Sequence, residues 1–311
     1  MSGIHILAAG KALPSKVVEN ADFEKSLDTS DEWIRTRTGI LRRHFCDENE
    51  NAATLAFRAS LLALTIAAET IPDIREKIGL VVTATCTPPG AMPSVSCYLQ
   101  EKLDLGKGIP AFDVNAACSG FEYALVSAVT LMDAMNADYA LIVGAEQMSK
   151  ILDFTDRSTC VLFGDGAGAA VIERKKEEAL IADLGAEGDY RALAADPCVR
   201  MDGKAVFRFA VTTLEREIRL LCDKAGIALS DIGAIVCHQA NIRIIRHVQR
   251  KLGLPEEKFV VNLQDLGNTS GASVPMALSD LCASGRLQHG SPVVLVGFGA
   301  GLTWGAVMVT I

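Results

Sequence analysis

The chain carries an internal duplication, because three short segments of its first half recur in its second half in the same order. The pairs are Ile78-Gly-Leu-Val-Val with Ile232-Gly-Ala-Ile-Val, Asn115-Ala-Ala-Cys-Ser-Gly with Asn268-Thr-Ser-Gly-Ala-Ser, and Leu141-Ile-Val-Gly with Val294-Leu-Val-Gly. The first pair is offset by 154 residues and the other two by 153. A nearly constant offset indicates two copies of one structural unit. We therefore expect two similar halves related by a pseudo-two-fold axis.

Each half is predicted to alternate strands with helices. Short runs such as Gly79–Ala84 and Ala140–Val143 are apolar on both faces, which is typical of strands covered by helices on each side. Alanine- and leucine-rich amphipathic stretches lie between such runs, so the predicted fold class is α/β. We place the boundary after a strand at Ala169–Glu173, which gives an N-terminal half at 1–173 and a C-terminal half at 174–311.

The first copy of the central turn places Cys118 among small residues, directly before the helix-prone run Phe121–Met135. Backbone N–H groups and the helix dipole stabilise a thiolate at such a position, so we expect a lowered pKa and a nucleophilic sulfur. The second copy leads into Val274–Cys282 and has no cysteine in the turn. Equivalent turns with different chemistry are expected around an active site between two lobes. Taken alone, however, this segment favours one more buried cysteine among nine.

Composition excludes several classes of protein. Half of the residues are apolar and 22% are charged, so we expect a large buried core rather than disorder. A net charge of −8 argues against nucleic-acid and membrane partners. The cysteines form no CxxC pair, which favours a reducing cytoplasm over disulfides. Without a signal-like start, a membrane-length apolar run or a metal-ligand spacing, the prediction is a cytoplasmic protein with no metal.

Two polar residues of the second half accompany Cys118. His238 follows the apolar strand Ala234–Cys237, and the carboxyl end of a strand is where α/β proteins place their sites. Asn268 opens the second copy of the turn, in the position equivalent to Asn115. A loop histidine and a turn asparagine are ordinary features by themselves, so only their combination with Cys118 points to chemistry.

Six motifs occur in register over nearly the whole chain. They are Asp-Glu-Trp-Ile-Arg-Thr-Arg-Thr-Gly-Ile (31–40), Asn-Ala-Ala-Cys-Ser-Gly-Phe (115–121), Phe-Gly-Asp-Gly-Ala-Gly-Ala (163–169), His-Gln-Ala-Asn (238–241), Gly-Asn-Thr-Ser-Gly-Ala-Ser-Val-Pro (267–275) and Gly-Phe-Gly-Ala-Gly-Leu-Thr-Trp-Gly (297–305). Together they resemble the β-ketoacyl-acyl-carrier-protein synthase III family. This resemblance implies the thiolase fold, a duplicated five-layer α/β/α/β/α sandwich with pseudo-two-fold related halves, working as a homodimer.

The resemblance also implies a reaction. The family's Cys-His-Asn triad falls on Cys118, His238 and Asn268. Cys118 takes an acyl group from acyl-CoA, and malonyl-acyl carrier protein then loses CO2 to give an enolate that attacks the thioester. The His238 Nε2–H and Asn268 side-chain N–H stabilise that enolate, and the backbone N–H groups of Cys118 and Ala300 form the oxyanion hole. The β-ketoacyl product initiates fatty acid synthesis, and no cofactor is required.

Binding positions carry over from the same resemblance. The matching CoA contacts are Trp33, Arg37, Arg157, Gly203, Phe207 and Asn241. Met92 falls near the position from which a partner subunit closes the acyl pocket, so we expect tolerance of primers longer than acetyl. The proposed docking residues for acyl carrier protein are Gln239, Arg243, Arg246 and Arg250. These arginines share one face of a predicted helix, which suits an acidic carrier protein.

The same motifs weigh against some related reactions and leave others open. A thiolase needs a second cysteine in the turn at 297–305, and elongating synthases have a histidine where this chain has Asn268. A secondary-metabolic condensing paralogue, hydroxymethylglutaryl-CoA synthase or another thiolase-superfamily acyltransferase stays open, because the triad does not define the acyl donor. A non-catalytic acyl-binding scaffold would lack a triad member. Gly164–Ala169 matches a loose dinucleotide-binding pattern but leads into a strand, so we predict a core turn.

Overall fold

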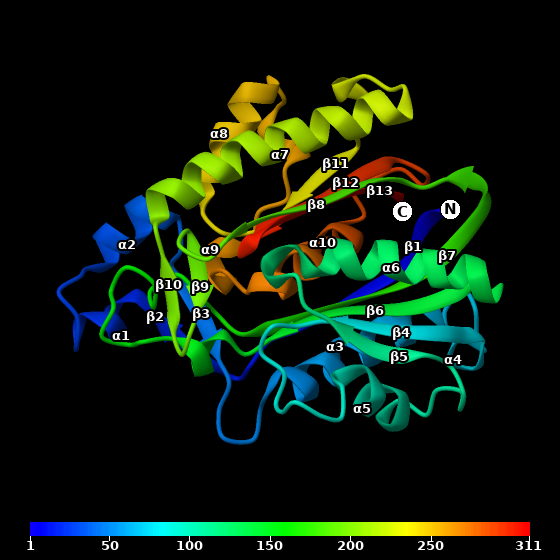
Figure 1. Cartoon of the computed structure of the whole chain (residues 1–311), viewed down its shortest axis with the longest axis horizontal. Helices are drawn as coiled ribbons and strands as arrows, with labels where there is room; N and C mark the ends of the chain where they lie inside the picture. Colours follow the sequence, from blue (N-terminus) through cyan, green and yellow to red (C-terminus); the bar gives the residue numbers. More distant parts are fainter.

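The computed structural model describes all 311 residues and arranges them in five layers (Figure 1). Helices α3 and α5 form one outer layer, α7 and α8 form the other, and α6 and α10 lie between two sheets. The strands are β1 (Ser2–Ala12), β2 (Lys16–Glu19), β3 (Arg42–Phe45), β4 (Ile78–Ala84), β5 (Ala111–Val114), β6 (Tyr139–Glu146), β7 (Gly166–Ala179), β8 (Ile181–Asp189), β9 (Leu193–Ala195), β10 (Val199–Met201), β11 (Ala234–Cys237), β12 (Pro292–Gly299) and β13 (Gly301–Thr310). The helices are α1 (Asn20–Glu24), α2 (Asp31–Thr38), α3 (Ala52–Ala67), α4 (Ile74–Lys77), α5 (Val95–Lys102), α6 (Gly120–Met135), α7 (Gly203–Ala225), α8 (Ile242–Leu252), α9 (Leu263–Leu266) and α10 (Ser273–Ser284), with short 3₁₀ turns η1 (Ala117–Ser119), η2 (Met148–Ile151), η3 (Leu229–Asp231), η4 (Glu256–Lys258) and η5 (Ser270–Ala272).

The nine main strands divide into an N-terminal and a C-terminal array. The first has the order β5-β4-β6-β7-β1, and the second contains β11, β12, β13 and β8. They meet where β1 runs parallel to β13 at one register pair, His5 with Thr310. The strand pairs β4–β5, β4–β6 and β11–β12 are parallel, as expected when helices connect successive strands.

The two arrays are copies of each other in the order of their elements. Strand β6 and strand β12 are both eight residues long and are offset by 153 at both ends. The turn η1 precedes α6 as η5 precedes α10, again at an offset of 153. The predicted duplicated thiolase-type architecture is therefore confirmed. The predicted boundary at residues 173 and 174 falls inside β7, which continues to Ala179, so the division into halves stays a prediction.

Three apolar clusters separate the layers. The central cluster packs α6 and α10 between the inner faces of both arrays through residues such as Phe121, Leu125 and Leu278. A second cluster lies under α3 and α5, and a third lies under α7 and α8. Because strand side chains alternate between faces, Leu80 and Val82 of β4 point to the central cluster while Val81 points to the outer one. No helix is both long and apolar enough to span a membrane.

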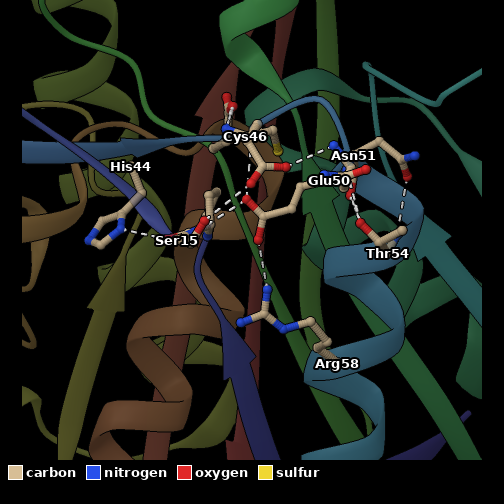
Figure 2. A network of polar contacts seen from close by, with 11 residues as sticks. Ser15, His44, Cys46, Glu50, Asn51, Thr54 and Arg58 are labelled. Atoms are coloured by element: carbon tan, nitrogen blue, oxygen red, sulfur yellow. Dashed lines mark hydrogen bonds and ion pairs between the residues drawn. The ribbon is translucent and has the colours of Figure 1, made fainter.

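The start of α3 shows how local polar contacts fix an outer helix (Figure 2). Asn51 caps the helix by accepting hydrogen bonds from the backbone N–H groups of Ala53 and Thr54, and the Thr54 hydroxyl accepts from the Asn51 N–H. Next to the cap, Glu50 accepts a 2.9 Å hydrogen bond from Arg58, one turn further into α3. With α3 held on the outer face, the inner face is left to α6 and α10, which carry the two central turns.

Candidate active site

The two central turns have the same backbone construction. In the first, Asn115 Oδ1 accepts a hydrogen bond of 3.1 Å from the Ala117 N–H, and in the second, Asn268 Oδ1 accepts one of 2.9 Å from the Ser270 N–H. Ala117 and Ser270 both adopt a left-handed conformation, with φ of 47° and 49°. A positive φ is uncommon outside glycine, so its occurrence at two positions 153 residues apart supports the duplication. Each turn faces the end of the opposite half's strand, η1 against β12 and η5 against β6.

Cys118 lies at the first turn and is only 6% exposed. Its Sγ is 3.4 Å from the Ser270 hydroxyl of the second turn. Burial raises the pKa of the Cys118 thiol to about 12, and the Ser270 hydroxyl opposes this shift. The predicted lowering of its pKa is therefore wrong in direction, because removal from water outweighs the helix position. In the free protein Cys118 is a thiol.

Because residue 299 is a glycine, the Cys118 backbone can pack against β12. A Cβ at Gly299 would lie 2.6 Å from the Cys118 nitrogen, a distance no real side chain tolerates. The next residue, Ala300, lines the same cavity as Cys118, so the extra methyl is accommodated. The Thr303 hydroxyl lies 3.0 Å from the carbonyl oxygens of both Ala116 and Ala300, which ties the nucleophile turn to this hairpin.

His238 comes directly after β11, as predicted, and is 1% exposed. Its Nδ1 lies 2.6 Å from the Ser273 hydroxyl, which also accepts a 3.4 Å hydrogen bond from the Gln239 N–H. This contact holds the ring in place, and with the ring hydrogen on Nε2 the hydroxyl is the donor to Nδ1. Burial lowers the pKa of His238 to about 3, so the ring is neutral.

Asn268 is also buried, and its amide is oriented by the second turn. Because Oδ1 accepts from the Ser270 N–H, the side-chain NH2 is left to face the cavity that Asn268 lines with Cys118 and His238. The backbone is held by hydrogen bonds to Leu162 and Gly164, at 2.8 and 2.9 Å. The site thus presents two neutral N–H donors from the second half to a sulfur from the first.

Cys118 lies between two cavities. A narrow one of about 140 Å³ contains His238, Asn268 and the three predicted tunnel residues, Gly203, Phe207 and Asn241. A larger one of about 590 Å³ is mostly apolar and is lined by residues that include Cys86, Met148, Ile151, Leu193, Ser270 and Ala300. A sulfur at the junction of a narrow channel and an apolar chamber suits a group that accepts an acyl chain from a long carrier.

The predicted nucleotide contacts lie together at the surface. The guanidinium groups of Arg157 and Arg37 lie 5.6 and 5.9 Å from the centre of the Trp33 ring, within cation–π range. Asp28 pairs with Arg157. Asn241 connects this region to the narrow cavity, because its Nδ2 donates to the Arg37 carbonyl while its Oδ1 caps α8. The predicted nucleotide contacts thus adjoin the predicted tunnel residues, and their role in binding CoA stays a prediction.

The predicted docking helix has a free basic face. Arg243, Arg246 and Arg250 are exposed on α8, and none of them pairs with a carboxylate. Gln239 does not belong with them: it is 1% exposed, and its amide is used by Cys237, Val260 and Asn262. Its prediction as a docking contact is wrong, because a buried side chain with all its hydrogen bonds made cannot meet a partner.

Met92 lies away from the cavities of its own chain that contain Cys118. It is 84% exposed and borders a different surface hollow with Tyr98 and Pro93. This position leaves the side chain free to reach a second subunit, and its role as a gate stays a prediction.

Several residues of the site were not found from the sequence. Ser270 and Ser273 are turn residues by composition, and only the offset of 153 marks Ser270 as the counterpart of Ala117. Two fully buried glutamates, Glu122 and Glu146, flank the turns. Acidic residues in apolar runs were the available signal, since they are almost never buried without a reason. No three His, Cys, Asp or Glu side chains gather where they would hold a metal ion.

The fold and site together define a condensing enzyme of the thiolase-fold class, an acyltransferase. Family models for 3-oxoacyl-[acyl-carrier-protein] synthase III match residues 112–188, and for its C-terminal part residues 222–311. The chain is 46% identical to β-ketoacyl-[acyl-carrier-protein] synthase III of Ruegeria pomeroyi over 97% of each chain, and 42% identical to that of Clostridium perfringens over 99% of each. The crystal structure of the Aquifex aeolicus synthase III superposes with a TM-score of 0.92 at 42% identity, covering 98% of this chain and 99% of the other. This chain belongs to the β-ketoacyl-[acyl-carrier-protein] synthase III family.

Proposed function

We propose that this enzyme condenses an acyl-CoA primer with malonyl-acyl carrier protein and so initiates fatty acid synthesis. The observation that carries the proposal is a single cavity in which Cys118 meets the N–H donors of His238 and Asn268. The relatives named above favour this reaction over a secondary-metabolic condensation. The chemistry needs no cofactor, because the leaving CO2 supplies the driving force.

In the first half-reaction, Cys118 Sγ attacks the thioester carbonyl of acyl-CoA. The C–S bond to CoA breaks, the acyl group remains on Cys118, and the cysteine proton leaves with the CoA sulfur as a thiol. Backbone N–H groups of Cys118 and Ala300 would stabilise the tetrahedral oxyanion. Since Cys118 rests as a thiol, its proton is lost only as the acyl donor arrives, which limits side reactions of a permanent thiolate.

In the second half-reaction, the malonyl group on the carrier protein loses CO2. The electron pair of the broken C–C bond forms a thioester enolate, whose oxygen accepts hydrogen bonds from His238 Nε2–H and Asn268 Nδ2–H. The enolate carbon attacks the acyl-Cys118 carbonyl, giving the β-ketoacyl carrier protein and releasing the Cys118 sulfur. That sulfur takes up one proton from solvent. His238 serves as a neutral donor because its pKa is far below neutrality.

The two substrates are assigned to the surfaces already described. Trp33, Arg37 and Arg157 would hold the nucleotide end of CoA, and Gly203, Phe207 and Asn241 would line the path of pantetheine. The arginine face of α8, formed by Arg243, Arg246 and Arg250, would bind the acidic carrier protein. We place the enzyme in the cytoplasm as a homodimer.

The larger cavity is assigned to the acyl primer. Its volume of about 590 Å³ and mostly apolar lining would accept chains longer than acetyl. In a dimer the partner's Met92 would close this chamber, and a flexible thioether adapts to different chain lengths. Rates with a series of straight and branched acyl-CoAs test the assignment, and a strict preference for acetyl-CoA would contradict it.

The central test follows the acyl group. Incubation with acetyl-CoA should add the mass of one acetyl group to Cys118, and added malonyl-acyl carrier protein should remove it as an acetoacetyl carrier protein. Both steps are read by intact-protein and peptide mass spectrometry. Labelling of another cysteine, or an acyl-enzyme that malonyl-acyl carrier protein fails to discharge, would contradict the proposal.

A further inference from the structure

Glu146 is the last residue of β6 and lies opposite the second turn. The offset of 153 makes Glu146 the counterpart of Gly299 and makes Gly271 the counterpart of Cys118. The first turn carries the side chain of Cys118 and faces a glycine, Gly299, at the end of β12. The second turn has the glycine, Gly271, and faces the side chain of Glu146 at the end of β6.

The close contacts follow this exchange. A Cβ added at Gly271 would lie 3.1 Å from Glu146 Oε1, just as a Cβ at Gly299 would collide with Cys118. Glu146 Oε1 accepts a 3.4 Å hydrogen bond from the Gly271 N–H, the group equivalent to the Cys118 N–H of the oxyanion hole. Glu146 thus takes the N–H that corresponds to the Cys118 N–H, while the counterpart of the Ala300 N–H, that of Gln147, donates to Thr87 Oγ1.

All the partners of Glu146 donate to it. The Cys86 N–H lies 3.1 Å from Oε2, and the Thr85 and Thr87 hydroxyls and the Cys86 thiol also point at the carboxylate. The Thr85 oxygen also accepts the Thr87 N–H, and the Thr87 oxygen accepts the Gln147 N–H. Burial raises the pKa of the Glu146 carboxyl above its ordinary value, and the hydrogen bonds from Thr87, Cys86 and Gly271 oppose that rise.

We propose that Glu146 is a positioning residue: a buried carboxyl group that accepts the Gly271 N–H and holds the Asn268–Ser270 turn in place for decarboxylation. The same carboxyl group accepts hydrogen bonds from Cys86, which lines the larger cavity. It therefore links the turn that would act on the malonyl group to the cavity that would hold the acyl group. Ser270, whose hydroxyl lies 3.4 Å from Cys118 Sγ and 3.8 Å from Cys86 Sγ, sits between the two. The proposal rests on the proposed function and assigns Glu146 no contact with substrate.

The test separates the two half-reactions in Glu146→Ala and Glu146→Gln. Glu146→Ala should slow malonyl-acyl carrier protein decarboxylation by about 100-fold, the cost of misplacing a donor by about 1 Å, while acetyl transfer from acetyl-CoA to Cys118 changes only a few-fold. Glu146→Gln keeps the shape but replaces an acceptor oxygen by a donor, so a smaller loss is expected. Cys86 and Ser270 line the larger cavity, so a small carboxylate can reach the space left by the Glu146 side chain. Added formate should therefore restore part of the decarboxylation rate of Glu146→Ala.

Glu217→Gln is the matched control. Glu217 is equally buried, lies on α7 away from both turns, and pairs with Arg216, so neither half-reaction should change. Equal losses in both half-reactions, normal decarboxylation in Glu146→Ala, or failure of formate to restore any rate would overturn the proposal. So would insolubility of both Glu146 variants, because it would make the residue a folding requirement. Absence of acetyl transfer in the unmodified enzyme would instead refute the proposed function.

Discussion

The two central turns have the same backbone but different chemistry. Both begin with an asparagine whose Oδ1 caps a backbone N–H, and both continue through a residue of positive φ into a helix of the middle layer. The first turn ends in the thiol of Cys118 and leaves Asn115 exposed, at the edge of the larger cavity. The second ends in Gly271 and buries Asn268 with its amide towards the sulfur.

The difference shows how a duplicated fold makes one active site instead of two. Side chain and glycine are exchanged between turn and strand end, so Gly299 stands opposite the Cys118 N–H, whereas Glu146 accepts the Gly271 N–H. The serine that opens α10, Ser273, stands where α6 has Gly120, and its hydroxyl hydrogen-bonds to His238 Nδ1. Under the proposed function, one turn binds the acyl group, and the other orients the donors for the enolate.

The largest effect is expected from removing the nucleophile. Cys118→Ala should lower condensation on the order of 10⁴-fold or more and abolish the acyl-enzyme seen by mass spectrometry. The double variant C118A/G271C moves the cysteine from the first turn into the second. It should stay inactive, because a side chain at 271 meets Glu146 at 3.1 Å. Recovery of an acyl-enzyme at position 271 would show that the turns are chemically interchangeable.

The next effect comes from the asparagines. Asn268→Ala removes a donor to the enolate and should slow malonyl-acyl carrier protein decarboxylation by about 10²–10³-fold, with acetyl transfer to Cys118 retained. Asn115→Ala is the matched change in the first turn, where the amide makes the same local bond but is exposed. It should affect decarboxylation only a few-fold. Similar losses in both variants would mean that Asn268 acts through the shape of the turn alone.

The sequence predicted the secondary structure around the two turns better than the electrostatics of the site. Runs such as Ala234–Cys237 and Phe121–Met135 match β11 and α6 closely, because strand and helix periodicity is local. The long α7 and the strands β8 to β10 were not predicted, since tertiary packing decides such mixed segments. The direction of the Cys118 pKa was wrong because burial depends on groups far along the chain, such as Gly299 of β12, that no local pattern displays.

A smaller catalytic effect is expected at Ser273. We expect the Ser273 hydroxyl to donate to His238 Nδ1, so Ser273→Ala should release the ring hydrogen from Nε2. Decarboxylation should fall about 10- to 100-fold, within the range for residues that orient a ligand or donor. Long-range ¹H–¹⁵N spectra of histidine-labelled protein report the tautomer, with His238→Ala identifying the signal. Ser279→Ala, on the same helix, should leave the spectrum unchanged, and an unchanged tautomer in Ser273→Ala would refute this role.

The smallest effect concerns stability and the positions after each turn. Glu122 follows the first turn on α6 and its counterpart on α10 is Pro275; each side chain rests on a glycine of the opposite half, Gly297 and Gly144. Neither Glu122 oxygen has a hydrogen-bond partner, and burial raises the pKa of Glu122 well above its ordinary value.

A raised folded-state pKa means that folding favours the protonated acid, so stability is lost as pH rises above the unfolded pKa. Glu122→Met should therefore raise the free energy of unfolding by about 1–3 kcal/mol, and by more at pH 8 than at pH 5. Urea unfolding at both pH values measures this, and a gain independent of pH would show that Glu122 carries no titrating proton.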